Sequence, residues 1–224
     1  MPARAPTIIF TLGLLGPAAA ADPTADFWSD DDPEARALAV NEGELELLAQ
    51  PPGKPVHHHH NEIFIEPGSL RTGWVRLEQC HEHLDPVPAL EIVYHPERIR
   101  KLRVLSLESV GQALVVDHSI QLEDVRPGGR ICVSAESRAL SDLGDGRFEL
   151  RNGPFMRRFL DGYYPMRVSM AIHHPEDVRL HGHEPGAQPG FDVLSTPGQV
   201  TMDAWFEGKL YTRFRFCAED ACPP

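Results

Sequence analysis

From Val56 onward, hydrophobic residues tend to occupy every second position, which is the repeat of a β-strand with one buried face. The clearest example runs from Met166 to Ile172, where hydrophobic residues alternate with polar or small ones. Turns such as Glu207-Gly208 separate these runs. Because strands do not alternate with helices along the chain, the pattern predicts an all-β fold, an antiparallel β-sandwich or open barrel.

The expected strands are short and numerous. Asp145-Gly146 is a hairpin turn that leads into Phe148 and Leu150, and Pro127-Gly128-Gly129 is a turn between two strands. The clearest strands are expected over residues 63–65, 74–84, 90–94, 100–108, 114–116, 119–122, 130–133, 166–172, 200–206 and 209–216.

Four parts are expected along the chain: a signal peptide (1–21), an N-terminal arm (22–55), the β-sandwich domain (56–217) and a disulfide-closed tail (218–224). In the arm, Asp32-Pro33-Glu34 has the residues of a helix start, so we expect a short helix there. One helical corner is expected within the domain, from Pro154 to Leu160. Its inward-facing residues would be Phe155, Phe159 and Leu160.

The first residues have the pattern of a secretory signal peptide. A basic residue, Arg4, precedes an apolar run over 7–15, and small residues follow at 18–21. The run is shorter than the roughly 20 apolar residues of a membrane-spanning helix. We therefore expect a periplasmic or secreted protein without a membrane span after removal of the signal.

Four cysteines fit export, since oxidising compartments favour disulfides. Three pairings are open, and we favour Cys217–Cys222, which closes a short loop, together with the long-range pair Cys80–Cys132. A thiolate metal site is the alternative, but the cysteine spacings are not those of C-x-x-C motifs. The formal charge of −12 argues against nucleic acid as a partner, because phosphate backbones require basic surfaces.

Histidine is the main candidate for chemistry, since neutral imidazole is the commonest metal ligand in proteins. Ten of the twelve histidines fall into three clusters. These are His57, His58, His59 and His60; His81 and His83; and His173, His174, His181 and His183.

Spacing decides which histidines can act together. Residues i and i+2 share a strand face, so His81 and His83 would lie side by side if extended, as would His181 and His183. The run 57–60 would form two pairs on opposite faces. Methionines 166 and 170 are better explained as core residues than as copper ligands. Histidine with carboxylate ligands, of which Glu62, Glu82, Asp85 and Glu91 are candidates, predicts copper or zinc.

These observations favour an exported protein that binds copper or zinc for metal binding, delivery or sensing, with binding that weakens below about pH 6. The alternative for each cluster is a solvated polar loop or a hydrogen-bonded histidine. H-E-x-x-H, G-x-S-x-G and P-loop motifs are absent from the sequence, which disfavours an enzyme, although a metal-dependent enzyme is the third interpretation.

A second interpretation rests on arginines and aromatic residues that occur close together in the sequence. They could form an anion or partner pocket in an envelope module that recognises a glycan, a peptide or a periplasmic protein without metal. The alternative is a corner helix whose arginines pair with Asp161 and neighbouring acids. The residues of this corner are Arg157, Arg158, Tyr163, Tyr164 and Arg167.

Overall fold

The computed structural model describes residues 43–159 and 162–222. Nearly all regular structure in these residues is β-strand, so the expected all-β fold is confirmed. The strands are β1 Glu46–Leu47, β2 His58–Phe64, β3 Trp74–Leu84, β4 Ala89–Val93, β5 Ile99–Val116, β6 Ser119–Arg138, β7 Leu140–Gly144, β8 Arg147–Phe155, β9 Arg158–Phe159, β10 Gly162–Tyr163, β11 Met166–His173, β12 Val178–Glu184, β13 Phe191–Thr196, β14 Gln199–Glu207 and β15 Leu210–Ala218. The signal peptide and the helix expected at Asp32 lie outside the described residues.

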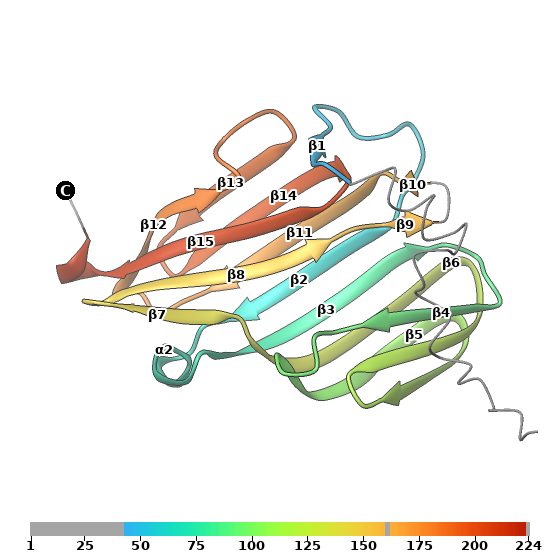
Figure 1. Cartoon of the computed structure of the whole chain (residues 1–224), viewed down its shortest axis with the longest axis horizontal. Coiled ribbons are helices and arrows are strands. Elements are labelled where there is room, and N and C mark those ends of the chain that lie inside the picture. The colour runs from blue at the N-terminus through green and yellow to red at the C-terminus, as the bar shows by residue number, and fades with distance from the viewer. Residues whose placement is uncertain (1–42, 160–161, 223–224) are drawn as a thin grey trace, which may run out of the picture.

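Two sheets lie against each other as a sandwich (Figure 1). The nine-stranded sheet has the order β1-β14-β11-β2-β3-β6-β4, with β13 paired to β14 and β5 paired to β6. The four-stranded sheet has the order β12-β15-β8-β7, and β9 and β10 form a separate pair. All described pairings are antiparallel except that of β11 with β2.

The main core lies between the sheets. The inward residues of β11 include Met166 and Met170, which confirms that these methionines pack in the core. They face aromatic residues of β15 such as Phe214, which is fully buried. A second cluster, which includes Ile120 and Ile131, is buried where β6 runs beside β4 and β5.

The prediction of a helix from Pro154 to Leu160 is wrong for residues 154–159, which are the described residues of that range. Strand β8 continues to Phe155, which pairs with Leu210 and is buried, and residues 158–159 form β9. Pairing with β15 therefore outweighs the local helical pattern. The α-helix of the described residues is instead α2, Pro67–Thr72, which has Pro67 at a helix start and Gly73 in the left-handed conformation at its end.

Two further expectations are corrected by strand length. Residues 127–129 do not form a turn between two strands but lie inside β6, which is 20 residues long. Likewise, the runs expected at 100–108 and 114–116 belong to one strand, β5. Within the arm expected over 22–55, β1 pairs with Phe206 and Glu207 of β14.

Both favoured disulfides are present. Cys80–Cys132 joins the neighbouring strands β3 and β6, and Cys217–Cys222 closes the chain between β15 and the 3-10 turn η1, Glu219–Ala221. Among the described residues, none of the helices has the length and apolar character needed to cross a bilayer.

Candidate functional site: a histidine-lined cavity between the sheets

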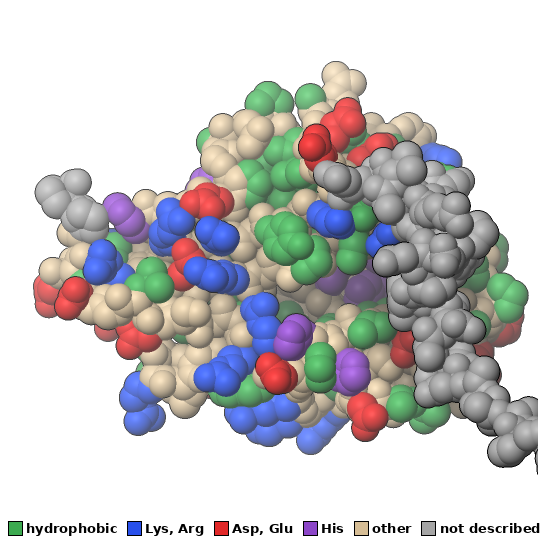
Figure 2. Space-filling view, in the orientation of Figure 1, with side chains coloured by type: hydrophobic (Ala, Val, Ile, Leu, Met, Phe, Trp, Pro, Cys, Tyr) green, Lys and Arg blue, Asp and Glu red, His purple; other side chains and the backbone are tan. Residues whose placement is uncertain are grey.

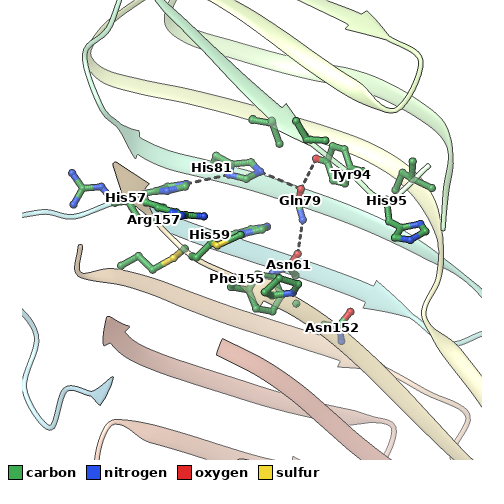
Figure 3. Close-up of a pocket in the computed structure, with 18 of the residues that line it drawn as sticks. His57, His59, Asn61, Gln79, His81, Tyr94, His95, Asn152, Phe155 and Arg157 are labelled. Carbon is green, nitrogen blue, oxygen red and sulfur yellow. Dashed lines mark hydrogen bonds between the residues drawn. The ribbon is translucent and has the colours of Figure 1, made fainter. Parts of the chain in front are cut away.

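A cavity of about 950 Å³ lies between β3, β4 and β8 and is lined at one end by histidines (Figure 3). Its volume is in the upper part of the range typical of small-molecule sites. Figure 2 shows it as a hollow between β8 and β4 with histidine side chains inside. The alternation of the strands produces its main wall. Inward positions of the β2 segment and of β3 contribute His57, His59, Asn61, Ile63, Val75, Leu77, Gln79 and His81.

This wall changes character along its length. Ile63, Val75 and Leu77 form an apolar part, and the histidines, Asn61 and Gln79 form a polar part. The cavity can therefore contact both apolar and hydrogen-bonding portions of one molecule.

A chain of hydrogen bonds fixes the orientation of two histidines. Tyr94 donates its hydroxyl to Oε1 of Gln79 over 2.5 Å, and His81 donates Nε2–H to the same oxygen over 3.1 Å. Nδ1 of His81 is then an acceptor, and His57 donates Nε2–H to it over 3.1 Å. Gln79 in turn donates to Oδ1 of Asn61 over 2.8 Å.

His57, His59 and His81 are neutral at pH 7. Burial is the main cause: it lowers the pKa of His57 to about 4 and that of His59 to about 3. It also lowers the pKa of His81 well below its ordinary value, and the neighbouring imidazoles act in the same direction. The rings of His59 and His81 stack with centroids 4.3 Å apart, an arrangement that a neutral pair tolerates and two imidazolium ions would not.

Several polar atoms of the cavity wall lack a hydrogen-bond partner. Among the described residues, five buried side-chain nitrogen or oxygen atoms are in this state, and four belong to residues that line this cavity. Leaving such an atom unpaired costs about 1–3 kcal/mol, so four such atoms in the side chains that form one cavity wall favour a hydrogen-bonding ligand, which these side chains would turn to meet. The four atoms are Nε2 of His59, Nδ2 of Asn61, Nδ2 of Asn152 and Oγ1 of Thr212.

An ion pair lies at the end of the cavity that is lined by His57, His59 and His81. Arg157 contacts Asp85 through two nitrogens, with Nε donating over 2.9 Å, and a third nitrogen donates to the carbonyl of Pro165. Both partners line the cavity. Arg157 is therefore already matched by a carboxylate of this protein.

The structure brings together His57, His59 and His81 from the predicted metal residues. No three His, Cys, Asp or Glu side chains within residues 43–159 and 162–222 are already arranged as a metal-ligand set. His83 does not lie beside His81, since it has a φ of 54° at a register shift of β3. The pairing expected for these two histidines fails because the strand is not extended there.

The run 57–60 divides between two faces as expected. His57 and His59 line the cavity, whereas His58 and His60 lie on the opposite face of the sheet, where both contact Ser169. A strand places successive side chains on opposite faces, so these four histidines cannot form one site.

The third cluster is dispersed. His173 contacts Glu62 over 3.0 Å, and His174 is buried and donates to the carbonyl of Pro175. His183 donates to the carbonyl of Pro185, while the bulge between Leu180 and Gly182 interrupts the register that would have aligned it with His181.

The corner of arginines and aromatic residues is also divided. Arg158 lies over the ring of Tyr163, and Arg157 lies near Tyr164. Arg167 is elsewhere, paired with Asp203 through two hydrogen bonds on the outer sheet face. Asp161, the partner expected in the alternative interpretation, lies outside the described residues.

The polar residues between the histidines were missed by the sequence reasoning. Asn61 and Gln79 occupy inward positions of strands whose other inward residues include Ile63 and Leu77. A polar residue in the buried register of an amphipathic strand is the signal that could have identified them.

No protein-family model matches the chain, and the search of curated proteins finds no match either.

Proposed function

We propose that this is an exported binding protein that holds a small amphipathic molecule in the cavity between its sheets. The observation that carries the proposal is the cavity together with four of its lining residues, each of which has a buried polar atom without a hydrogen-bond partner. The signal-like N-terminus and the two disulfides support a periplasmic or secreted location.

The wall indicates what the ligand offers. Nδ2 of Asn61 and Nδ2 of Asn152 are donors, so the ligand presents acceptor oxygens such as hydroxyls or carbonyls. The apolar part, which includes Leu77, accommodates a hydrocarbon portion. From Val75 to His81 the wall spans six residue steps, or about 20 Å. A glycan head with an alkyl chain has this chemistry and length.

Calorimetric titration with n-octyl β-D-glucoside below its micelle concentration tests the proposal. We expect saturable binding to the full mature protein and loss of that binding in Asn61→Leu and in Leu77→Trp, which fills the cavity. Arg76→Trp places the same bulk at an exposed position one residue away and should bind normally. Equal binding by the cavity variants and the control would overturn the proposal, as would no binding to the wild type.

The second candidate is copper or zinc held by His57, His59 and His81. Nε2 of His57 and Nδ1 of His81 are 3.1 Å apart, close to the separation of two nitrogens that share a tetrahedral ion at about 2.0–2.1 Å. The proton on Nε2 of His57 must then move to its Nδ1, and the ring of His59 must rotate. Gln79 accepts the other N–H of His81, as residues behind metal ligands do.

Metal titration of the mature protein separates the two candidates. Metal binding predicts a stoichiometric Cu(II) or Zn(II) site that His81→Ala removes and His181→Ala, on β12, leaves intact. Because burial keeps these imidazoles deprotonated, binding should persist below pH 6 and weaken near pH 4. A stoichiometric site that survives His81→Ala would contradict this assignment.

A further inference from the structure

The outer face of the large sheet carries a serine held by two histidines. Ser169 lies on β11, and the parallel register places it opposite His60 of β2. Oγ of Ser169 is 2.7 Å from Nε2 of His58 and 2.8 Å from Nδ1 of His60. On the next strand, β3, Glu82 lies opposite His58, and its Oε2 is 3.2 Å from Nδ1 of His58.

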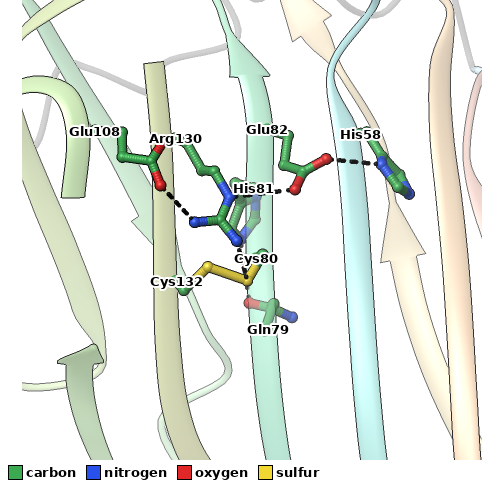
Figure 4. The surroundings of a disulfide bond; sticks show 8 residues. All are labelled: His58, Gln79, Cys80, His81, Glu82, Glu108, Arg130 and Cys132. Carbon is green, nitrogen blue, oxygen red and sulfur yellow. Dashed lines mark hydrogen bonds and ion pairs between the residues drawn. A yellow bond between two sulfur atoms is a disulfide. The ribbon is translucent and has the colours of Figure 1, made fainter. Parts of the chain in front are cut away.

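Glu82 is a carboxylate held in place by a cation. Figure 4 shows its side chain between Arg130 and His58, and Arg130 donates Nε–H to it over 3.2 Å. Burial alone would raise the pKa of Glu82, but the hydrogen bonds from Arg130 and His58 outweigh it and lower that pKa. Glu82 is therefore ionised at neutral pH and acts only as an acceptor.

The carboxylate determines the direction of every hydrogen bond in the cluster. Since Glu82 only accepts, Nδ1 of His58 carries its proton and Nε2 of His58 has a free lone pair. The hydroxyl of Ser169 then donates to Nε2 of His58. With that proton committed, Oγ accepts the Nδ1–H of His60.

This arrangement is that of an activated nucleophile: a hydroxyl, a base within hydrogen-bond reach, and a carboxylate that orients the base. We propose that Ser169 is a nucleophile toward small activated esters and organophosphorus acylation mimics, with His58 as its general base and Glu82 as the positioning residue for His58.

The reaction balances without a cofactor. Oγ forms a bond to the ester carbonyl carbon while its proton passes to Nε2 of His58. The bond to the alcohol oxygen breaks, and His58 returns the proton to that oxygen. Water, deprotonated by His58, then releases the acid and regenerates Ser169.

The surroundings restrict the substrate to small, reactive esters. The neighbouring residues Val168 and Met170 are buried in the core, so Ser169 faces away from the sandwich. Backbone N–H groups of β11 are paired with the neighbouring strands, and Nδ1–H of His60 donates to Oγ, the attacking atom, rather than to the carbonyl oxygen of an ester. Turnover should therefore be slow compared with that of an enzyme with an oxyanion hole.

The charges around His58 favour a free base at neutral pH. Burial and the guanidinium of Arg167 on β11 lower the pKa of His58, and His60 on the same strand adds to this, although Glu82 opposes it. Arg167 is itself held by Asp203 of β14.

The test is labelling of the full protein with an alkyl fluorophosphonate, followed by intact mass measurement and peptide mapping. In labelling, the Oγ–phosphorus bond forms, fluoride leaves and the proton passes to His58. We expect one adduct, on Ser169, and no adduct in Ser169→Ala. His58→Gln should slow labelling by about 100-fold, the scale of general-base assistance. Glu82→Gln should lower the maximal labelling rate and leave the half-saturating reagent concentration unchanged.

Two controls make the result decisive. Ser134 on β6 is a half-buried serine whose pairing partner is Glu78 rather than a histidine, so Ser134→Ala should leave the labelling rate unchanged. Release of p-nitrophenol from p-nitrophenyl acetate should fall in Ser169→Ala to the background of free imidazole. Absence of an adduct on Ser169, or an equal labelling rate in His58→Gln, overturns the proposal. None of the residues tested here lines the cavity, so failure of this test would leave the cavity proposal intact.

Discussion

Between pH 8 and pH 5 the wild type should lose unfolding free energy, and replacing His59 with phenylalanine should make that loss smaller by about 2 kcal/mol. In the folded protein, burial lowers the pKa of His59 to about 3 from an ordinary value of 6.5. Below pH 6.5 the unfolded chain therefore binds a proton that the folded chain does not bind, and acid favours unfolding. At pH 5 the solution is 1.5 pH units below the pKa of the unfolded histidine, and each unit is worth about 1.36 kcal/mol, which gives about 2 kcal/mol.

His57 adds a similar amount, because burial lowers its pKa to about 4. The wild type should thus lose about 4 kcal/mol of unfolding free energy to these two residues between pH 8 and pH 5. The assay is guanidinium unfolding at pH 8, 7, 6 and 5, followed by circular dichroism. Replacing the exposed His181 with glutamine is the control, which should keep the wild-type pH dependence. An identical pH dependence in His59→Phe and the wild type would contradict the lowered pKa of His59.

Three further changes should be measurable by the same unfolding assay. Replacing Cys80 and Cys132 with alanine should cost about 4 kcal/mol, because their link spans 52 residues; an unchanged midpoint would contradict this. Phe214→Ala should cost about 3–5 kcal/mol, since its ring is fully buried between the sheets, and a loss below 1 kcal/mol would show that the site is not core. Gly208→Ala should cost about 1–3 kcal/mol, because a Cβ there would collide with the carbonyl oxygen of Glu44; equal stability would exclude this contact.

The sequence predicts the faces of strands better than their ends. Alternation at Met166–Ile172 identified a core strand, and the same rule divided the run 57–60 between two faces. It did not reveal that β6 continues through residues 127–129, where the pairing with β5 passes from Val125 to Arg130 across a bulge and Gly129 pairs with Leu84 of β3. Local glycine and proline signals cannot report such long-range pairing.

The candidate site was predicted only in part, for a related reason. His59 meets His81 because the register of β2 and β3 places them opposite each other. That register depends on contacts between residues 22 positions apart, and no local pattern encodes it. Gln79 and Tyr94, which orient His81, come together through the same tertiary packing.

The most direct test of ligand binding between the sheets is a map of amide chemical-shift changes as n-octyl β-D-glucoside is added to the isotopically labelled mature protein. We expect saturable shifts concentrated at the inward residues of β2 and β3, above all at Asn61 and Gln79, and their loss in Leu77→Trp. Shifts confined to the outer sheet face, or no shifts below the micelle concentration, would contradict binding between the sheets.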